Sequence, residues 1–312
     1  MADILVLGYE YWAGVTAGML RRMGYDARPW APSADALPAA LRWCRPLRWL
    51  GWALTGPFRT AAAVHVIAPP GRQPLIRLAG WMHKRIILHW VGTDVLNLRA
   101  EVAARGPAAV DFYRRMAHAQ FADAPELIEE LAALGLRADL FRLLPDAVEP
   151  RDVPLPDRPA VLSYWAPERR EFYGGPILDA LAEEFPDVPF LIVGNDGHGQ
   201  PQHPNMTYLG RLESLEDVYR QTSILVRLPE HDSLSAMVLE MLGRGRRVIY
   251  SRPFPHTEHA TTPEEARAAL RRCLAEREFN RAGQAYVRQN FAPAAEAARV
   301  APLVRQAMGR NP

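Results

Sequence analysis

The chain has 312 residues, which is long for one compact core and suits two α/β domains of about 150 residues each. Its hydrophobic fraction of 49% and charged fraction of 23% are ordinary for a globular protein. The formal net charge of +2 offers no global attraction for nucleic acid, so we expect no nucleic-acid partner. Lys84 is the only lysine, so almost every cation is an arginine, which can hold phosphate with two parallel hydrogen bonds.

The sequence shows no targeting segment and no membrane span. Asp3 follows the first methionine almost at once, which is not the pattern of an export signal. No stretch approaches the ~20 apolar residues that a transmembrane helix needs. The two cysteines, Cys44 and Cys273, form neither a disulfide framework nor a metal-type spacing with histidines. These features predict a cytoplasmic protein, or one that is peripheral at the inner face of the membrane.

The first half of the chain alternates short apolar runs with amphipathic stretches, which is typical of a parallel sheet covered by helices. The predicted strands here are residues 4–7, 64–68, 86–91 and 118–121. A loop over residues 8–14 is predicted to lead from the first strand into a helix that ends near Met23. Strands with so few polar interruptions are expected to be buried on both faces, as in a doubly wound sheet.

A proline-rich linker, residues 146–159, ends the first domain, residues 1–145. The alternation of strands and helices then restarts in a second domain, residues 160–292. Its predicted strands are residues 160–164, 189–193, 206–209, 224–227 and 247–250, and its predicted helices are residues 177–184, 215–221, 236–242 and 263–276. A last helix, within residues 293–312, is expected to pack back on the first domain.

The clearest chemical pattern lies in residues 230–251, which read EHDSLSAMVLEMLGRGRRVIYS. Two acids, Asp232 and Glu240, lie eight residues apart across the start of a predicted helix. Unpaired N–H groups and the helix dipole favour an anion such as a diphosphate at a helix start. The residues that open this helix are Leu234, Ser235 and Ala236. Glu240, about one turn further in, is then placed to hold a pair of ribose hydroxyls.

This segment resembles the nucleotide-sugar motif of the large retaining glycosyltransferase family with the GT-B fold. The family pattern is E-G-F-G-L-V-x-L-E-A-M-A-C-G-x-P-V-I, and here it reads D-S-L-S-A-M-V-L-E-M-L-G-R-G-R-R-V-I, with Glu240 and Gly245 in register. Residues 191–197, LIVGNDG, and 205–211, NMTYLGR, are similar to two further segments of that family. The chain departs from the pattern at the first acid, which is aspartate instead of glutamate.

The resemblance implies an α/β fold of the GT-B class, two Rossmann-like domains facing across a cleft, with a nucleotide-sugar donor on the second domain. It implies that Asp232 faces the donor sugar and Glu240 the nucleotide, with no cofactor and no obligatory metal. The family has an arginine and a lysine after the first strand of this domain, where this chain has Arg169 and Arg170; Arg211 is a third candidate for the donor. The alternatives are a helix cap followed by an exposed glutamate, and solvated loop charges.

In the first domain, residues 86–94, IILHWVGTD, carry polar groups to the end of a predicted buried strand. This strand end resembles that of many GT-B enzymes of bacterial polysaccharide assembly. Asp94 is then predicted to act as a general base for an acceptor hydroxyl or to bind the acceptor sugar, and His89 to contact the donor sugar. The alternatives are a structural histidine and an aspartate that caps the next helix. Gly14 is predicted to let the backbone approach a sugar, or else simply to turn the chain.

Residues 42–59, RWCRPLRWLGWALTGPFR, mix arginines with aromatic side chains. A basic and aromatic helix suits the headgroup layer of an anionic membrane, and such contact would fit a lipid-linked acceptor. The alternative is a set of ordinary core tryptophans beside solvated arginines.

The sequence therefore predicts a glycosyltransferase that moves a sugar from a nucleoside-diphosphate sugar to a glycan, lipid-linked or small-molecule acceptor. The resemblance implies retention of the anomeric configuration, although Asp94 also suits an inverting base. Three rivals stay open: a nucleotide-sugar epimerase, a non-catalytic nucleotide-sugar-binding relative, and a nicotinamide-dependent oxidoreductase. The last is disfavoured because residues 8–14 lack the three-glycine dinucleotide fingerprint.

Overall fold

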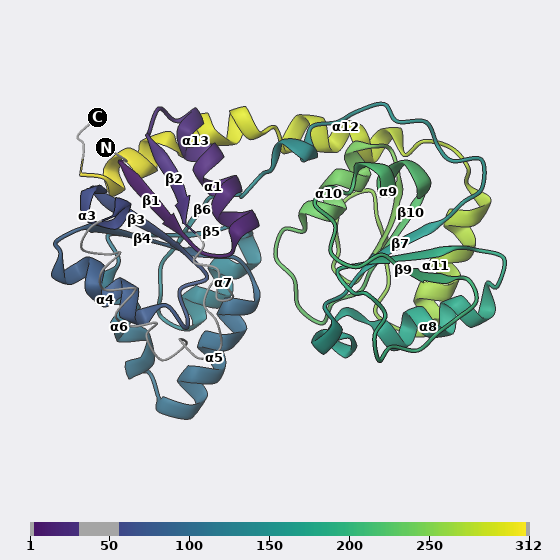
Figure 1. The fold of residues 1–312 in the computed structure, drawn as a ribbon, viewed down its shortest axis with the longest axis horizontal. Coiled ribbons are helices and arrows are strands. Elements are labelled where there is room, and N and C mark those ends of the chain that lie inside the picture. Colours follow the sequence, from purple (N-terminus) through teal and green to yellow (C-terminus); the bar gives the residue numbers. More distant parts are fainter. Residues whose placement is uncertain (1–2, 31–55, 310–312) are drawn as a thin grey trace. The chain divides into compact units, whose positions relative to one another are not determined.

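The computed structural model describes residues 3–30 and 56–309, which fold into two compact units (Figure 1). Unit 1 comprises Met1–Pro145 and Pro293–Pro312, and unit 2 comprises Asp146–Ala292. The predicted linker, residues 146–159, thus belongs to unit 2. The last helix belongs to unit 1, where it contacts the first helix of the chain.

Unit 1 contains a six-stranded parallel sheet with the order β2–β1–β3–β4–β5–β6. Its strands are β1 (Ile4–Leu7), β2 (Ala27–Trp30), β3 (Ala63–Ile67), β4 (Arg85–Trp90), β5 (Ala119–Ala122) and β6 (Asp139–Leu140). Its helices are α1 (Glu10–Arg22), α3 (Pro57–Thr60), α4 (Gln73–Trp81), α5 (Thr93–Arg105), α6 (Ala108–Met116), α7 (Pro125–Ala133) and α13 (Pro293–Ala307). All residues of β1 and β3 are buried, as expected for central strands with helices on both faces.

Unit 2 contains a second six-stranded parallel sheet, with the order β12–β11–β10–β7–β8–β9. Its strands are β7 (Val161–Tyr164), β8 (Phe190–Val193), β9 (Met206–Tyr208), β10 (Ile224–Arg227), β11 (Arg247–Tyr250) and β12 (Glu258–His259). Its helices are α8 (Gly175–Glu184), α9 (Glu216–Gln221), α10 (Ala236–Gly243), α11 (Pro263–Ala275) and α12 (Arg281–Asn290), with short 3₁₀ turns η2 (Asp146–Val148), η3 (Pro167–Arg169) and η4 (Glu171–Tyr173). The prediction of two Rossmann-like domains is confirmed.

The end of α10 shows why this chain segment turns where it does. Gly245 has a φ of +68° and donates its amide to the carbonyl of Leu242, while the Arg246 amide reaches back to Met241. A Cβ at position 245 would lie 2.3 Å from Cδ1 of Phe279. Only glycine fits both this left-handed conformation and this close approach, so Gly245 directs the chain from α10 into β11.

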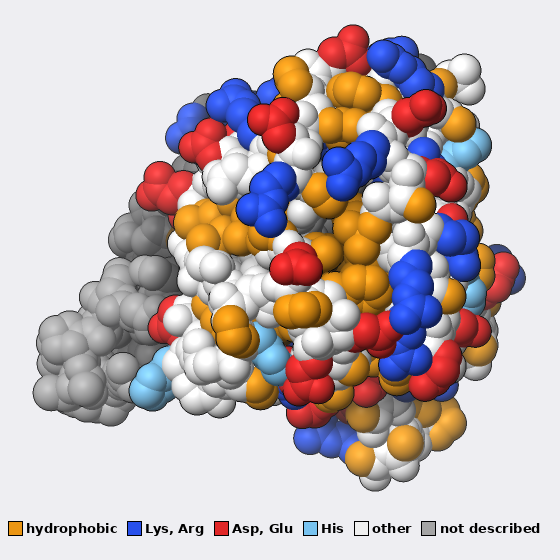
Figure 2. Space-filling model, turned by 90° about the vertical axis from the view of Figure 1, so that its right-hand side faces the viewer, with side chains coloured by type: hydrophobic (Ala, Val, Ile, Leu, Met, Phe, Trp, Pro, Cys, Tyr) orange, Lys and Arg blue, Asp and Glu red, His pale blue; other side chains and the backbone are white. Residues whose placement is uncertain are grey.

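The face of the molecule in Figure 2 carries acidic and basic side chains in mixture, with hydrophobic side chains between them. Unit 2 carries exposed or half-buried ion pairs such as Arg272–Glu258 and Arg271–Glu184. In residues 3–30 and 56–309, no helix is both long and apolar enough to cross a bilayer.

Candidate functional site

The carboxyl ends of β7, β10 and β11 meet where the sheet of unit 2 changes direction. The chain runs from β7 outward through β8 and β9 and then returns to β10 on the other side of β7. Open parallel sheets bind ligands in the crevice at this switch point. Tyr164, Arg227 and Tyr250 are the last residues of the three strands, and Arg227 is in register with Tyr250. Their side chains therefore mark a candidate site.

Asp232 lies at this edge in a hydrogen-bonded network. Arg227 Nε donates to Asp232 Oδ2 over 2.8 Å, and the Tyr250 hydroxyl donates to the same oxygen over 3.1 Å. The Ser233 amide lies 3.2 Å from Oδ1, and Arg252 donates to the Asp232 carbonyl. Burial raises the pKa of Tyr250 well above its ordinary value, so this hydroxyl remains a donor at neutral pH. The predicted site acid is thus paired with an arginine of the neighbouring strand.

Aromatic rings line the guanidinium of Arg227. Its central carbon lies 5.8 Å from the ring centroid of Tyr164 and 5.6 Å from that of Tyr173. The Arg169 guanidinium lies 5.7 Å from the same Tyr173 ring and 3.8 Å from the ring of Phe172. An aromatic ring stabilises a guanidinium through its flat face, so the N–H groups in the guanidinium plane are still able to donate hydrogen bonds. Two arginines from different segments therefore meet at one tyrosine.

The helix that follows Asp232 begins as predicted. Ser235 is the N-cap of α10, and its Oγ accepts a long hydrogen bond of 3.5 Å from the Val238 amide. In the part of the chain that the structure describes, no acceptor is hydrogen-bonded to the amides of Leu234, Ser235 and Ala236. These amides open the helix at the same edge as Asp232, which is the arrangement that an anion requires.

Glu240 lies in the second turn of α10 and is only 5% exposed, so the alternative of an exposed glutamate is wrong. One of its carboxylate oxygens accepts a hydrogen bond from the hydroxyl of Tyr219, on α9. The Arg244 guanidinium lies 4.6 Å from the Tyr219 ring centroid and donates to the Glu240 carbonyl over 2.9 Å. Burial raises the pKa of Glu240, whereas the Tyr219 hydrogen bond and the charge of Arg244 lower it. This carboxylate is held in place by its neighbours.

The three predicted donor arginines lie in different surroundings. Arg170 forms an ion pair with Asp179 on α8, and its side chain is 15% exposed. Arg211 lies in the loop after β9 and is exposed. Only Arg169 lies beside the aromatic rings at the switch point, next to Tyr173.

In unit 1, the prediction that His89 contacts the donor sugar is wrong. His89 is completely buried, with Nε2 3.0 Å from the carbonyl oxygen of Phe141 and Nδ1 3.0 Å from Nε2 of His65. Burial lowers the pKa of His89 to about 3, so the ring is neutral at physiological pH. Nε2–H then donates to the Phe141 carbonyl, and Nδ1 accepts from His65. The pair is a hydrogen-bonded part of the core.

Asp94 lies in the first turn of α5 and is 4% exposed. Its carboxylate accepts from the amide of Val91, over 3.0 Å to Oδ1 and 3.2 Å to Oδ2, and thereby closes the loop between β4 and α5. Burial raises the pKa of Asp94 to about 7, although the backbone hydrogen bonds oppose this shift. The carboxyl is therefore both a loop-closing group and an acid that titrates near neutrality.

Gly14 does not lie in a loop. Helix α1 begins at Glu10, so the predicted loop over residues 8–14 is only two residues long, and Gly14 lies inside the helix with no atom within 4 Å of a Cβ built on it. The switch point of this sheet lies between β1 and β3. There Tyr9 is 60% exposed, and the Arg72 guanidinium lies 4.8 Å from its ring centroid. The sequence reasoning missed both side chains.

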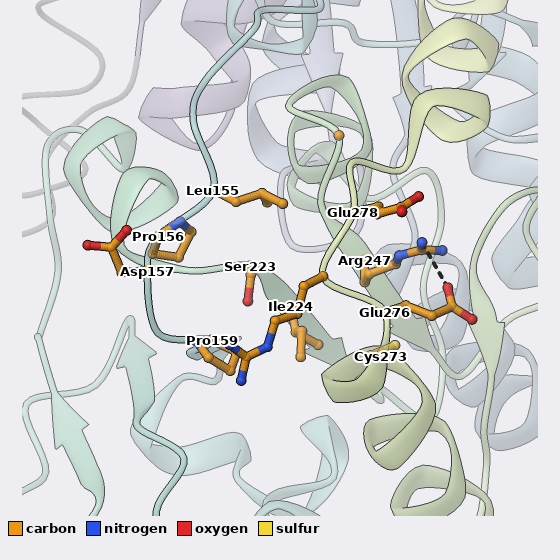
Figure 3. A pocket seen from close by; sticks show the side chains of 12 residues that line it. Leu155, Pro156, Asp157, Pro159, Ser223, Ile224, Arg247, Cys273, Glu276 and Glu278 are labelled. Carbon is orange, nitrogen blue, oxygen red and sulfur yellow. Dashed lines mark ion pairs between the residues drawn. The ribbon is translucent and has the colours of Figure 1, made fainter.

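A small hollow of about 40 Å³ lies at the opposite, amino-terminal edge of the unit 2 sheet (Figure 3). Arg247 and Glu276 point toward each other on one side of it and form an ion pair of 2.8 Å, while Leu155 and Pro156 lie on the other side. One buried water requires a cavity volume of ~10–15 Å³, so the hollow has room for a few waters but not for a nucleotide. Its position on the wrong edge also excludes it as the switch-point site.

Residues 42–55 of the predicted membrane segment lie outside the described residues. Phe58, at its end, is completely buried and lies 5.8 Å from the Lys84 ammonium group, so this aromatic ring belongs to the core. Over residues 3–30 and 56–309, no group of three or more His, Cys, Asp or Glu side chains is arranged to hold a metal ion.

No protein-family model and no curated protein sequence matches the chain. Among solved structures, HepE of Anabaena in complex with UDP-glucose is similar over 97% of this chain and 99% of its own, with a TM-score of 0.71 and 12% identity. Sucrose-phosphate synthase of Thermosynechococcus elongatus is similar over 100% of both chains, with a TM-score of 0.72 and 14% identity. The chain has a GT-B-type fold. A putative UDP-N-acetylglucosamine 2-epimerase of Listeria monocytogenes is similar over 100% of this chain and 98% of its own, with a TM-score of 0.59 and 11% identity.

Within this fold, the sequence reasoning missed three members of the unit 2 site. Arg227 ends an otherwise apolar strand, ILVR, and a charge in that position is the one signal that points to it. Tyr173 and Tyr219 carry no such signal, because their contacts with Arg227 and Glu240 are made across the fold.

Proposed function

We propose that the protein is a glycosyltransferase that uses a nucleoside-diphosphate sugar as donor. The observation that carries this proposal is Glu240, a buried carboxylate held one turn inside a helix whose open amides face the switch point of a Rossmann-like sheet. Solved structures with the same fold support it, since one of them, HepE, binds UDP-glucose and another is a sucrose-phosphate synthase. Fold alone does not define an activity, so the proposal depends on the site.

On the donor side, Glu240 would bind the ribose hydroxyls, and the amides of Leu234, Ser235 and Ala236 would bind the diphosphate. Two charge-stabilising groups, a helix start and arginines, lie at this edge, so we propose a metal-independent transfer. Asp232 would contact the donor sugar or orient the groups that do. In the reaction the bond between the anomeric carbon and the diphosphate oxygen breaks, with the electron pair leaving on the diphosphate.

On the acceptor side, unit 1 would bind a glycan or lipid-linked acceptor, whose hydroxyl oxygen forms the new bond to the anomeric carbon. Asp94 remains the candidate to receive the hydroxyl proton, because its pKa of about 7 suits a general base at neutral pH. Tyr9 and Arg72, at the switch point of unit 1, are added as acceptor contacts. Contact with an anionic membrane surface and a role in polysaccharide assembly belong to the same proposal.

A panel of UDP-, GDP-, ADP- and TDP-sugars in a thermal-unfolding assay tests the donor site. A ligand at 100 times its dissociation constant stabilises the protein by about 2.7 kcal/mol, which is readily measured. We expect one member to raise Tm, and we expect Glu240→Ala to remove that rise. Glu278→Gln is a matched control, because Glu278 is an exposed acid of the same unit at the amino-terminal edge of the sheet. No rise for any member, or the same rise in Glu240→Ala, would refute the proposed site.

A nucleotide-sugar epimerase is the second candidate, supported by the fold shared with a putative UDP-N-acetylglucosamine 2-epimerase. The two functions differ in what the donor does alone. An epimerase converts the bound sugar without any acceptor, whereas a glycosyltransferase shows at most slow hydrolysis. Analysis of the donor by NMR after incubation with the protein, with and without glycan acceptors, decides between them. A non-catalytic relative would bind the donor and leave it intact in both cases.

A further inference from the structure

Only one nitrogen of the Arg227 guanidinium, Nε, donates a hydrogen bond to a described residue. Nε donates to Asp232, and among the described residues no other acceptor is hydrogen-bonded to this side chain. Nη1 and Nη2 have no such acceptor, and they are not sealed from solvent. The side chain is nevertheless only 11% exposed. A largely buried arginine with four N–H donors left over is poised to bind an anion.

The position of Arg227 matches that of a ligand at the switch point. The residue ends β10, which is the neighbour of β7 across the point where the strand order reverses. Asp232 and the open amides at the start of α10 follow it in the chain. Arg169 reaches the same place from the segment after β7, and both guanidinium groups lie within 6 Å of the Tyr173 ring centroid.

The segment after β7 cannot supply two cations to this place. Arg170, the second of the two adjacent arginines, is directed into an ion pair with Asp179, which also lies 3.3 Å from Nε2 of His203. A Cβ on Gly175 would lie 2.3 Å from Cγ of Arg170, so the side chain is packed against the start of α8. Moving Arg170 to the switch point would leave Asp179 without its arginine partner in a site that is 19% exposed.

We propose that Arg227, from strand β10, binds the diphosphate of the nucleotide together with Arg169. The proposal rests on the proposed function and names a residue that the sequence motif does not contain. Asp232 holds Arg227 through Nε, which leaves the N–H groups of Nη1 and Nη2 for the ligand. Tyr164 and Tyr173 keep the guanidinium plane in place by stacking.

This arrangement gives Arg227 and Asp232 opposite effects on anion binding, although they are partners. Loss of the Arg227 charge removes hydrogen bonds to the diphosphate. Loss of the Asp232 charge leaves Arg227 in place, since an asparagine oxygen still accepts from Nε, and it removes a negative charge beside the anion. A purely structural ion pair would behave differently, because loss of either partner would then weaken binding.

The experiment measures dissociation constants of a nucleoside, its monophosphate and its diphosphate by calorimetry, with the base chosen from the donor panel. We compare the wild type with Arg227→Gln, Arg227→Lys and Asp232→Asn. For Arg227→Gln we expect the ratio of diphosphate to nucleoside affinity to fall about 10- to 100-fold, with nucleoside affinity unchanged. Arg227→Lys should recover only part of this loss, because lysine lacks the fork. For Asp232→Asn we expect diphosphate affinity to be equal or a few-fold higher.

The matched control is Arg247→Gln. Arg247 begins the adjacent strand β11 and is ion-paired with Glu276, but it lies at the amino-terminal edge of the same sheet. We expect this variant to leave the affinity ratio unchanged. If Arg227→Gln does not fold, Arg227→Lys and Asp232→Asn still decide the question through the sign of their effects.

The outcomes separate this inference from the proposed function. If the wild type binds no nucleotide at all, the proposed function fails and the inference with it. If the wild type binds the diphosphate and Arg227→Gln keeps the same affinity ratio, Arg227 does not contact the diphosphate and the inference alone is overturned. A fall in diphosphate affinity of similar size in Asp232→Asn would also overturn it, since the pair would then be structural.

Discussion

The two sheets have the same number of parallel strands, yet their predicted site residues have different environments. In unit 2, Asp232 and Glu240 lie at the carboxyl edge, each held by a side chain from another segment. In unit 1, His89 is turned into the core and Asp94 is closed into its own loop. The difference follows from strand order. Asp232 follows β10, which borders the switch point, whereas His89 and Asp94 lie at the end of β4, one strand away from it.

The comparison teaches that a polar residue at a strand end is placed for a ligand most directly where the strand borders the switch point of the sheet. At the switch point, neighbouring strands connect in opposite directions and no connection covers their ends. In unit 1, Tyr9 and Arg72 lie at this switch point, whereas Asp94 lies one strand away from it.

The largest expected effect concerns Asp94 and tests whether burial raises the pKa of its carboxyl group. Its folded pKa of about 7 lies above the ordinary value of 3.8, so the folded state keeps a proton that the unfolded state loses. The unfolding free energy of the wild type should therefore fall as pH rises from about 4 to about 7, and Asp94 should cause no further change above that pH. At about 1.4 kcal/mol per pKa unit, the fall is up to roughly 4 kcal/mol. Asp94→Asn should remove this slope in urea unfolding measured across pH.

The same variant sharpens the acceptor proposal. If Asp94 is the general base, kcat/KM of the wild type should rise with pH with an apparent pKa near 7. In Asp94→Asn, activity should fall strongly, and any residual kcat/KM should lack this rise. An unchanged pH profile with full activity would leave Asp94 a loop-closing residue only.

The next effect concerns the core histidines. His89→Ala removes a completely buried ring and leaves the Phe141 carbonyl and His65 without their partner, which should cost about 3 kcal/mol of unfolding free energy. Donor affinity should not change, because the proposed donor site lies in unit 2. Urea unfolding and nucleotide calorimetry check the two parts. A donor affinity that falls while stability is kept would restore His89 as a site residue.

A smaller effect is expected at Tyr219, which holds Glu240 from another helix. Tyr219→Phe should lower the preference for a nucleoside diphosphate over its 2′,3′-dideoxy form about tenfold, because Glu240 loses its fixed position. The control is Tyr208→Phe, since the Tyr208 hydroxyl donates to the Pro201 carbonyl at the surface of the same unit. Equal losses for both nucleotides would mean that Tyr219 supports the fold and not the ribose contact.

The smallest effect concerns Gly14. Because Gly14 lies inside α1 with open space at its Cβ, Gly14→Ala should stabilise the protein by about 0.5–1 kcal/mol and leave donor and acceptor kinetics unchanged. Thermal unfolding and steady-state rates check this. A rise in KM without loss of stability would show that a ligand does approach this backbone.

The sequence by itself determined the fold class and the position of one helix start. Buried parallel strands such as Ile224–Arg227 and Arg247–Tyr250 have uninterrupted apolar runs, and Gly245 marks a turn that only glycine can make, so these features follow from local chemistry. The two-residue strands β6 and β12 and the polar helix α12 were missed, because they are too short or too weakly patterned to be read locally.

Only the tertiary structure decided what the polar residues do. Arg170 and Arg227 both look like cations at strand ends, but one faces Asp179 on a helix and the other faces Asp232 and two tyrosines at the switch point. His89 was likewise predicted as a site residue, but its surroundings make it part of the core. The physical reason is that burial and pairing depend on groups far apart in the chain, and these set both the pKa of a side chain and the direction in which it can act.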